Sequence, residues 1–203
     1  MRRADTKDGG MGLLTMILGL ALFLGAHSLP TMIDRRAALV GRMGEGGYKG
    51  AFSMASLAGL VLIAIGYGMY RQSGYIQLWT PPRGLSHLTL LLMWPALIAF
   101  VAAYLPGEIK RRLKHPMLVG VKIWAFSHLL ANGDLGSLIL FGAILAWAVY
   151  DRISVKKRQP DAGAGIPKGF GRNDVIAILI GTAAWGLLIK LHPWLIGVPV
   201  FQM

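Results

Sequence analysis

The sequence predicts an all-α fold, a polytopic membrane bundle of about six transmembrane helices. Of its 203 residues, 55% are hydrophobic and only 15% are charged, and the mean hydropathy is +0.55. Soluble domains carry about a quarter charged residues, spread along the chain, whereas here the charges are clustered between long uncharged stretches. A soluble chain of this length could not bury so much apolar surface, so lipid is the expected solvent for most of it.

Six segments have the length and apolar composition of membrane spans. About 20 residues, at a rise of ~1.5 Å each, cross the hydrocarbon core, so the first, second, third and sixth segments reach across comfortably and the other two are marginal. Only Asn132, Gly133 and Asp134 separate the fourth segment from the fifth, which predicts a tight helical hairpin with Asp134 as the N-cap of the fifth helix. The spans, in one predicted domain of residues 1–203, are residues 11–33, 50–70, 84–106, 116–131, 135–150 and 175–196.

The basic residues are distributed unequally between the two sides of the predicted bundle. The loops after the first, third and fifth spans hold most of the Lys and Arg. Because basic loops stay in the cytoplasm, both termini are expected in the periplasm, with the bundle in a bacterial inner membrane. Residues 152–173, which include the Gly-, Pro- and Lys-rich stretch 156–172, are expected to form a flexible cytoplasmic loop. The first span is too long for a cleaved signal peptide, and Met11 is an alternative start.

Composition excludes several classes of protein. The net charge of +12 is explained by cytoplasmic basic loops, and no basic run is interleaved with aromatic residues as a nucleic-acid groove requires. The absence of cysteine excludes disulfides, thiolate haem ligands, Cys zinc sites and cysteine nucleophiles. The expected partners are the lipid bilayer and either a lipophilic substrate or a membrane redox partner, with no nucleic acid.

Small residues recur four apart in two of the spans, a spacing that lets helices approach closely in lipid. In a chain with 27 glycines such pairs also arise by chance, so they indicate a packed bundle and no particular contact. The pairs are Ala55 with Gly59, Ala64 with Gly68, Ala177 with Gly181, and Thr182 with Gly186.

All five histidines lie in or beside the spans. Burying an ionisable side chain in lipid is costly, so each suggests function. Neutral imidazole is a common ligand of b-type haem iron, and two histidines on different helices can hold one haem. His27 and His128 are the best placed, and the alternative is that they hydrogen-bond a neighbouring helix. Trp124 and Asn132 share the helix face of His128, whereas His87 and His192 stand at span ends.

Two further residues join the candidate cofactor site. His115 follows a cluster of four basic residues and precedes Pro116, so it is a candidate anion or head-group contact as well as a candidate ligand. Lys122 lies inside the fourth span, where its charge is expected to snorkel, face a polar cavity or pair with an anion. That anion would be Asp134, Glu108 or a cofactor propionate.

Three motifs resemble the NnrU family of bacterial membrane proteins. They are FLGAHSLP in the first span, YKGAFSMASLAGLVLIAIGY in the second, and HPMLVGVKIWAFSHLLANGDLGSLILFGAILAWAVYD at residues 115–151. The resemblance implies a role in denitrification or nitric-oxide metabolism. The family is similar to zeta-carotene isomerase, a membrane enzyme whose two histidine ligands of haem b match His27 and His128. Ala125 stands where the isomerase has a cysteine, which argues against redox-linked ligand switching.

The predicted topology favours a different pair of ligands. The first span runs inward and the fourth outward, so His27 is expected near the cytoplasmic side and His128 ~20 Å along its helix from that side. His115 matches the depth of His27 better, whereas the resemblance favours His128. Three functional hypotheses follow: a haem-b protein of NnrU type, an isomerase of a polyene such as a carotenoid, or a cofactor-free structural or assembly protein.

Overall fold

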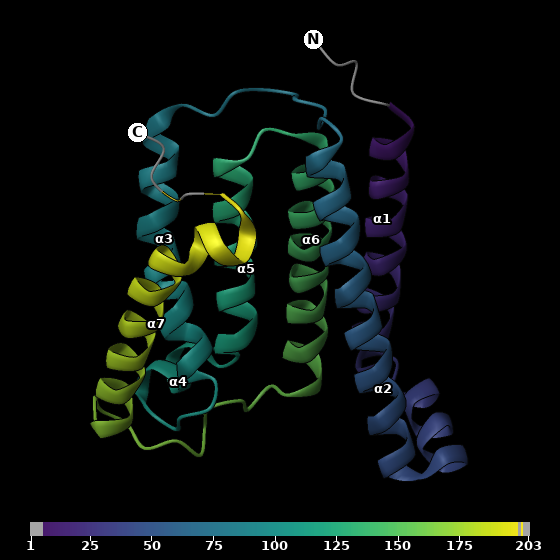
Figure 1. Cartoon of the computed structure of the whole chain (residues 1–203). Coiled ribbons are helices and arrows are strands. Elements are labelled where there is room, and N and C mark those ends of the chain that lie inside the picture. Colours follow the sequence, from purple (N-terminus) through teal and green to yellow (C-terminus); the bar gives the residue numbers. More distant parts are fainter. Residues whose placement is uncertain (1–5, 199, 201–203) are drawn as a thin grey trace. The chain divides into compact units, whose positions relative to one another are not determined.

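The computed structural model describes residues 6–198 and residue 200 and is helical throughout, with no β-strand in those residues. Gln77 and Asp134 form one isolated antiparallel bridge. The elements are α1 (Thr6–Ser28), the 3₁₀ helix η1 (Leu29–Thr31), α2 (Ile33–Gln72), α3 (Arg83–Ala102), α4 (Glu108–Leu113), α5 (Pro116–Ala131), α6 (Leu135–Arg158) and α7 (Arg172–Ile196) (Figure 1).

Five of these helices are long and apolar enough to cross a bilayer, namely those that contain α1, α2, α3, α6 and α7. The sixth apolar helix, α5, is shorter and covers residues 116–131 as expected. Many large apolar side chains on these helices are exposed, among them Met54 and Leu91. The chain is therefore a multi-pass membrane protein, and the predicted fold class is confirmed.

The chain forms two compact units. The first consists of the residues up to Trp79 together with Asp134–Ala143, and the second consists of Thr80–Gly133 and the residues from Ile144 onward. The first unit contains α1, η1, α2 and the beginning of α6, and the second contains α3, α4, α5, the rest of α6 and α7.

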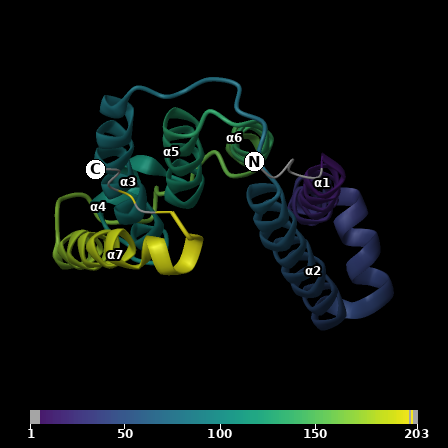
Figure 2. The ribbon, with the colours of Figure 1, turned by 45° about the horizontal axis from the view of Figure 1, so that its top comes forward.

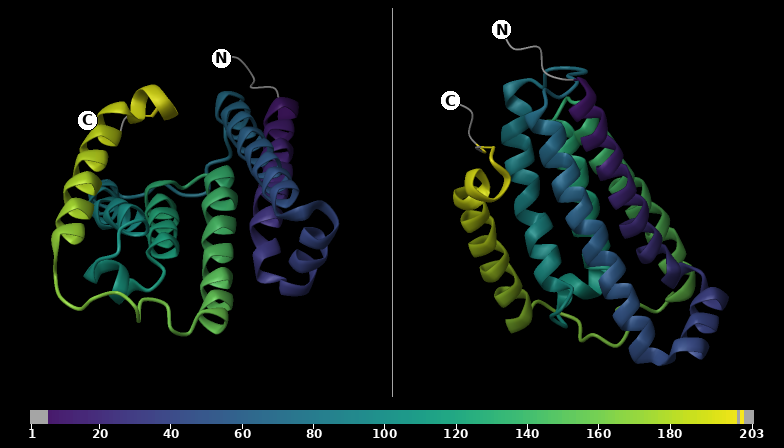
Figure 3. Two further views of the ribbon diagram at one scale, coloured as in Figure 1. Left: turned by 90° about the horizontal axis from the view of Figure 1, so that it is seen from below. Right: turned by 45° about the vertical axis from the view of Figure 1, so that its right-hand side comes forward.

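In the first unit, α1 and α2 lie side by side (Figures 2 and 3) with their backbones in direct contact. Glycines make this possible. A Cβ atom added to Gly66 of α2 would lie 2.3 Å from the backbone nitrogen of Met16, and one on Gly19 of α1 would lie 2.6 Å from that of Ile63. Gly12 and Gly59 make equivalent contacts. Each helix thus presents two glycines seven residues apart, a spacing that the sequence did not indicate.

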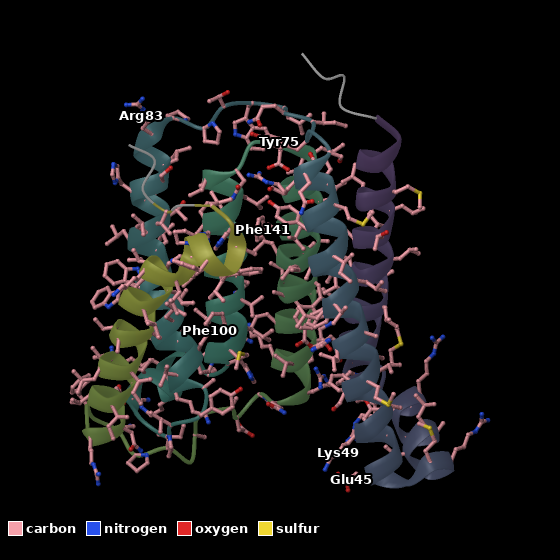
Figure 4. The ribbon with its side chains drawn as sticks, viewed as in Figure 1. Glu45, Lys49, Tyr75, Arg83, Phe100 and Phe141 are labelled. Carbon is pink, nitrogen blue, oxygen red and sulfur yellow. The ribbon has the colours of Figure 1, made fainter. Side chains whose placement is uncertain are left out.

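In the second unit, α3 packs against both α5 and α7. Ala96 and Ala99 of α3 are buried, and a Cβ on Gly120 of α5 would lie 2.7 Å from the ring of Phe100 (Figure 4). A Cβ on Gly181 of α7 would lie 2.7 Å from the Cα of Ile98. Of the four predicted small-residue pairs, those with Gly59 and Gly181 therefore mark helix contacts, whereas a Cβ at Gly68 or Gly186 would meet nothing within 4 Å.

Several helices have bounds that differ from those of the predicted spans. α1 ends at Ser28, because Pro30 cannot continue the helix and instead belongs to η1. Residues 33–49, expected to be a loop, are helical and belong to α2, which is interrupted only at Gly44 (φ 71°, ψ 166°). This left-handed backbone suits glycine.

The bounds of two further helices also differ. α3 ends at Ala102, before residue 106, and the short helix α4 follows. α6 continues to Arg158 instead of ending at residue 150, so the predicted loop 152–173 begins with helix. Polar helical turns outside the bilayer carry no hydropathy signal, which explains why the sequence did not reveal them.

Candidate functional site

His27 lies in the last turn of α1. Its Nδ1 is 2.8 Å from the carbonyl oxygen of Phe23, four residues earlier. Since a carbonyl can only accept, Nδ1 must carry the hydrogen in the neutral imidazole, and Nε2 is the unprotonated nitrogen. The ring stacks on Phe23 at a centroid distance of 4.1 Å and lies 5.0 Å from the ring of Phe52 of α2. Two aromatic rings and one hydrogen bond thus orient this imidazole.

His128, in the last turn of α5, has the same arrangement. Its Nδ1 donates to the carbonyl oxygen of Trp124 over 2.8 Å, and its ring centroid lies 5.2 Å from that of Trp124. Asn132 donates from Nδ2 to the carbonyl oxygen of His128 over 2.8 Å. The three residues predicted to share a helix face are therefore in contact, and Nε2 of His128 is again the nitrogen that can ligate a metal. His27 belongs to the first unit and His128 to the second.

The remaining histidines are held differently. His192 donates from Nδ1 to the carbonyl oxygen of Val198 over 2.6 Å, beyond the end of α7, and His87 is exposed near the start of α3. Nε2 of His115 is buried and has no hydrogen-bond partner in the part of the chain that the structure describes. Burial lowers the pKa of the His115 imidazole, and the positive charge of Arg152 adds to the lowering. The lowered pKa favours the neutral imidazole, and among the described residues no carbonyl accepts a hydrogen bond from the ring.

Lys122 is half-buried in α5, and among the described residues of its unit it forms no ion pair. The two carboxylates proposed as its partners have other partners within their own units. Asp134 lies 3.5 Å from a guanidinium nitrogen of Arg71, and Glu108 pairs with Arg111 and Arg112. The pairing of Lys122 with a cofactor propionate stays a prediction.

The first unit contains a buried polar cluster. Of its residues, only Asp134 was predicted to have a role, as an N-cap. Asp134 is 2% exposed and accepts from the backbone nitrogen of Ser137 at 2.9 Å, which confirms it as the N-cap of α6. It also accepts from the Ser137 hydroxyl at 2.6 Å, and that hydroxyl lies 2.7 Å from the hydroxyl of Tyr67. Because Ser137 donates to the carboxylate, Tyr67 must donate to Ser137. These contacts fasten the start of α6 to α2.

Two acidic residues organise the end of the second unit that contains α4 and the start of α7. Asp174 is 1% exposed and accepts from the backbone nitrogens of Glu108 and Ile109 at 3.0 and 2.7 Å. Glu108 accepts from the Nε atoms of Arg111 and Arg112, each at 2.6 Å, and from the backbone nitrogen of Gly169 at 3.1 Å. Hydrogen bonds from the two arginines hold the pKa of the Glu108 carboxyl well below its usual range. This network joins α4, the loop before α7, and α7.

Within residues 6–198 and residue 200, no three His, Cys, Asp or Glu side chains gather in a way that could hold a metal ion. A haem iron needs no such cluster, because the porphyrin supplies four ligands and the protein only the axial ones. The donors best oriented for that task are the two imidazoles with a helix carbonyl on Nδ1.

The helices and these histidines define a class, a multi-pass α-helical membrane protein with oriented imidazoles near the ends of its spans. The chain belongs to the NnrU family, because the model of that family, described as NnrU protein, matches residues 15–200. Comparison with curated proteins and with solved structures found no match.

Proposed function

We propose that this NnrU-family membrane protein binds haem b through Nε2 of His27 and Nε2 of His128. One observation carries the proposal: each imidazole donates Nδ1–H to the carbonyl four residues earlier, at 2.8 Å in both cases. A hydrogen bond of this kind fixes the tautomer, aims Nε2 and raises its basicity, and metal-ligating histidines almost always have one.

The surrounding residues fit a haem. Phe23 and Phe52 flank the first imidazole and Trp124 the second, and flat aromatic and apolar surfaces of this kind are suited to a porphyrin face. Lys122 supplies a cation for a propionate carboxylate, and Asn132 holds the end of α5 that carries His128. His115 is the alternative second ligand, with a buried Nε2 but no orienting carbonyl.

If bound, haem b would supply one-electron chemistry, and a small ligand such as nitric oxide would have to displace one of the two histidines to reach the iron. That chemistry agrees with the role in denitrification or nitric-oxide metabolism that the family resemblance implies. The chain itself holds a proton on Nδ1 of each ligand, fixes the ring planes, and excludes water by placing both histidines in apolar helices.

The test is the absorption spectrum of protein expressed with ample haem. His27→Ala and His128→Ala are each expected to abolish or strongly shift the Soret band, because either change removes an axial ligand. His87→Ala and His192→Ala are matched controls that should leave the band intact. Loss in His115→Ala with retention in His128→Ala would transfer the second ligand to His115. Wild-type protein that purifies colourless and takes up no haem on titration would overturn the proposal.

A further inference from the structure

The first unit has a hollow of about 260 Å³ where α2 is interrupted. Pro30 of η1 lies on one side, and Arg36 comes from the part of α2 before Gly44. The part of α2 after Gly44 supplies Tyr48, Lys49, Phe52 and Ser53. Drug-sized ligands occupy pockets of about 300–1,000 Å³, so this smaller, open hollow is suited to a single polar group such as a lipid head group.

Arg36 occupies an unusual position for a cation. Along the helical turns of 33–43 it shares a face with Ile33 and Val40, whereas Arg35 and Arg42 lie about 100–120° around the helix from it. Its guanidinium lies 5.4 Å from the centroid of the Tyr48 ring, within reach of a cation–π interaction. The helix therefore directs one of its three arginines toward the hollow.

Two further features indicate a hydrogen-bonding, negatively charged ligand. Tyr48 is only 6% exposed, and in the described residues its buried hydroxyl has no hydrogen-bond partner, an arrangement that is costly unless a ligand compensates it. The Lys49 ammonium lies 2.9 Å from Glu45, but both side chains are more than 60% exposed (Figure 4). Such a surface pair is weak, so Lys49 can turn to a stronger anion.

We propose that this hollow binds the phosphate group of an anionic phospholipid, between Arg36 and Lys49. The neighbouring surface identifies a lipid as the source of the phosphate. Met32, Ile33 and Met43 expose apolar side chains beside the arginines of residues 33–43, which is the pattern of a helix lying in the membrane interface. Basic residues at this surface attract anionic lipids. This site does not depend on haem.

The test measures the phosphatidylglycerol retained by the full-length protein in phosphatidylcholine nanodiscs that contain a minor fraction of phosphatidylglycerol. Arg36→Gln and Lys49→Gln are each expected to lower retention about fivefold, since one basic residue near anionic lipid contributes ~1 kcal/mol. Arg35→Gln is the matched control, with the same change of charge at a residue of the same helix that does not line the hollow, and should retain the wild-type amount. Excess inorganic phosphate should not displace the lipid.

Three results would overturn the proposal. Equal losses in Arg35→Gln and Arg36→Gln would show that only diffuse surface charge attracts the lipid. Unchanged retention in both Arg36→Gln and Lys49→Gln would show that the hollow is not the site, and displacement by inorganic phosphate would assign it to a soluble anion. Lys49 is largely exposed, so Lys49→Gln carries the test even if Arg36→Gln fails to fold. Loss of the Soret band in the histidine variants has no bearing on this outcome.

Discussion

At the scale of single residues, the chain repeatedly satisfies a polar side chain with backbone close in sequence. Side chains of a helix lean toward its N-terminus, so a histidine can reach the carbonyl four residues earlier. His27 and His128 both do so. In lipid this hydrogen bond has two effects. It satisfies one ring nitrogen where water is absent, and it makes the other nitrogen the one that can ligate a metal. Local geometry therefore orients both imidazoles for the haem that we propose.

The buried carboxylate of Asp134 makes several stabilising contacts. Asp134→Ala removes the N-cap of α6, the acceptor of the Ser137 hydroxyl and the partner of Arg71. We expect a loss of about 1–2 kcal/mol of unfolding free energy, the upper part of the range for N-cap removal, seen as a lower midpoint of thermal unfolding in detergent. Asp161→Ala, at an exposed loop position, is the control. Equal midpoints for the two variants would contradict this role.

At the scale of helices, association in the first unit depends on glycine. Helices in lipid gain little from the hydrophobic effect, so van der Waals contact between backbones is what brings them together. The four glycines at the contact of α1 with α2 give the two backbones this access. In the second unit, Gly120 and Gly181 have the same function on either side of α3.

Two glycines of α2 provide a matched test of this packing. Gly66→Ala would place a methyl group 2.3 Å from the backbone of Met16, whereas Gly68→Ala meets nothing within 4 Å. We expect Gly66→Ala to destabilise the protein by about 1–3 kcal/mol through overpacking, and Gly68→Ala to be neutral or stabilising by up to about 1 kcal/mol, because alanine favours helix. Thermal unfolding in detergent measures both. A Gly66→Ala protein as stable as Gly68→Ala would disprove the close contact.

At the scale of the whole molecule, charge decides the orientation of a multi-pass protein. The ends of α6 and α4 carry clusters of Lys and Arg, including Lys156, Lys157 and Arg158. Translocating these clusters would be opposed by the positive-inside bias. By the same bias we expect the hollow beside Arg36 and Lys49, at the connection between the first two spans, to face the cytoplasmic leaflet, where anionic head groups attract basic residues.

Because the chain has no cysteine, single cysteines can report this orientation directly. Asp161→Cys lies in the loop after α6 and Thr80→Cys in the segment before α3, both exposed. In intact spheroplasts a membrane-impermeant maleimide is expected to label Thr80→Cys and to label Asp161→Cys only after permeabilisation. The opposite pattern would reverse the topology and move the lipid hollow to the outer leaflet.

Features that depend on composition and local pattern could be predicted from the sequence alone. Hydropathy per residue measures transfer into lipid, so it identified a multi-pass helical protein and the limits of α5. The hairpin residue Asp134 was recognisable as an N-cap because capping is a local property. The motifs around His27 and His128 were sufficient to indicate the family.

The contacts between side chains and backbones of different helices could be seen only in the folded protein. The sequence did not predict the helical residues 33–43, because a polar helix has the same low hydropathy as a loop. The partners of Gly66 and Gly19 come from segments far apart in sequence, and the hollow beside Arg36 and Lys49 forms where α2 is interrupted at Gly44. Periodicity reports the environment of each residue, whereas contacts between elements depend on how the helices cross, and no pattern along one helix encodes that.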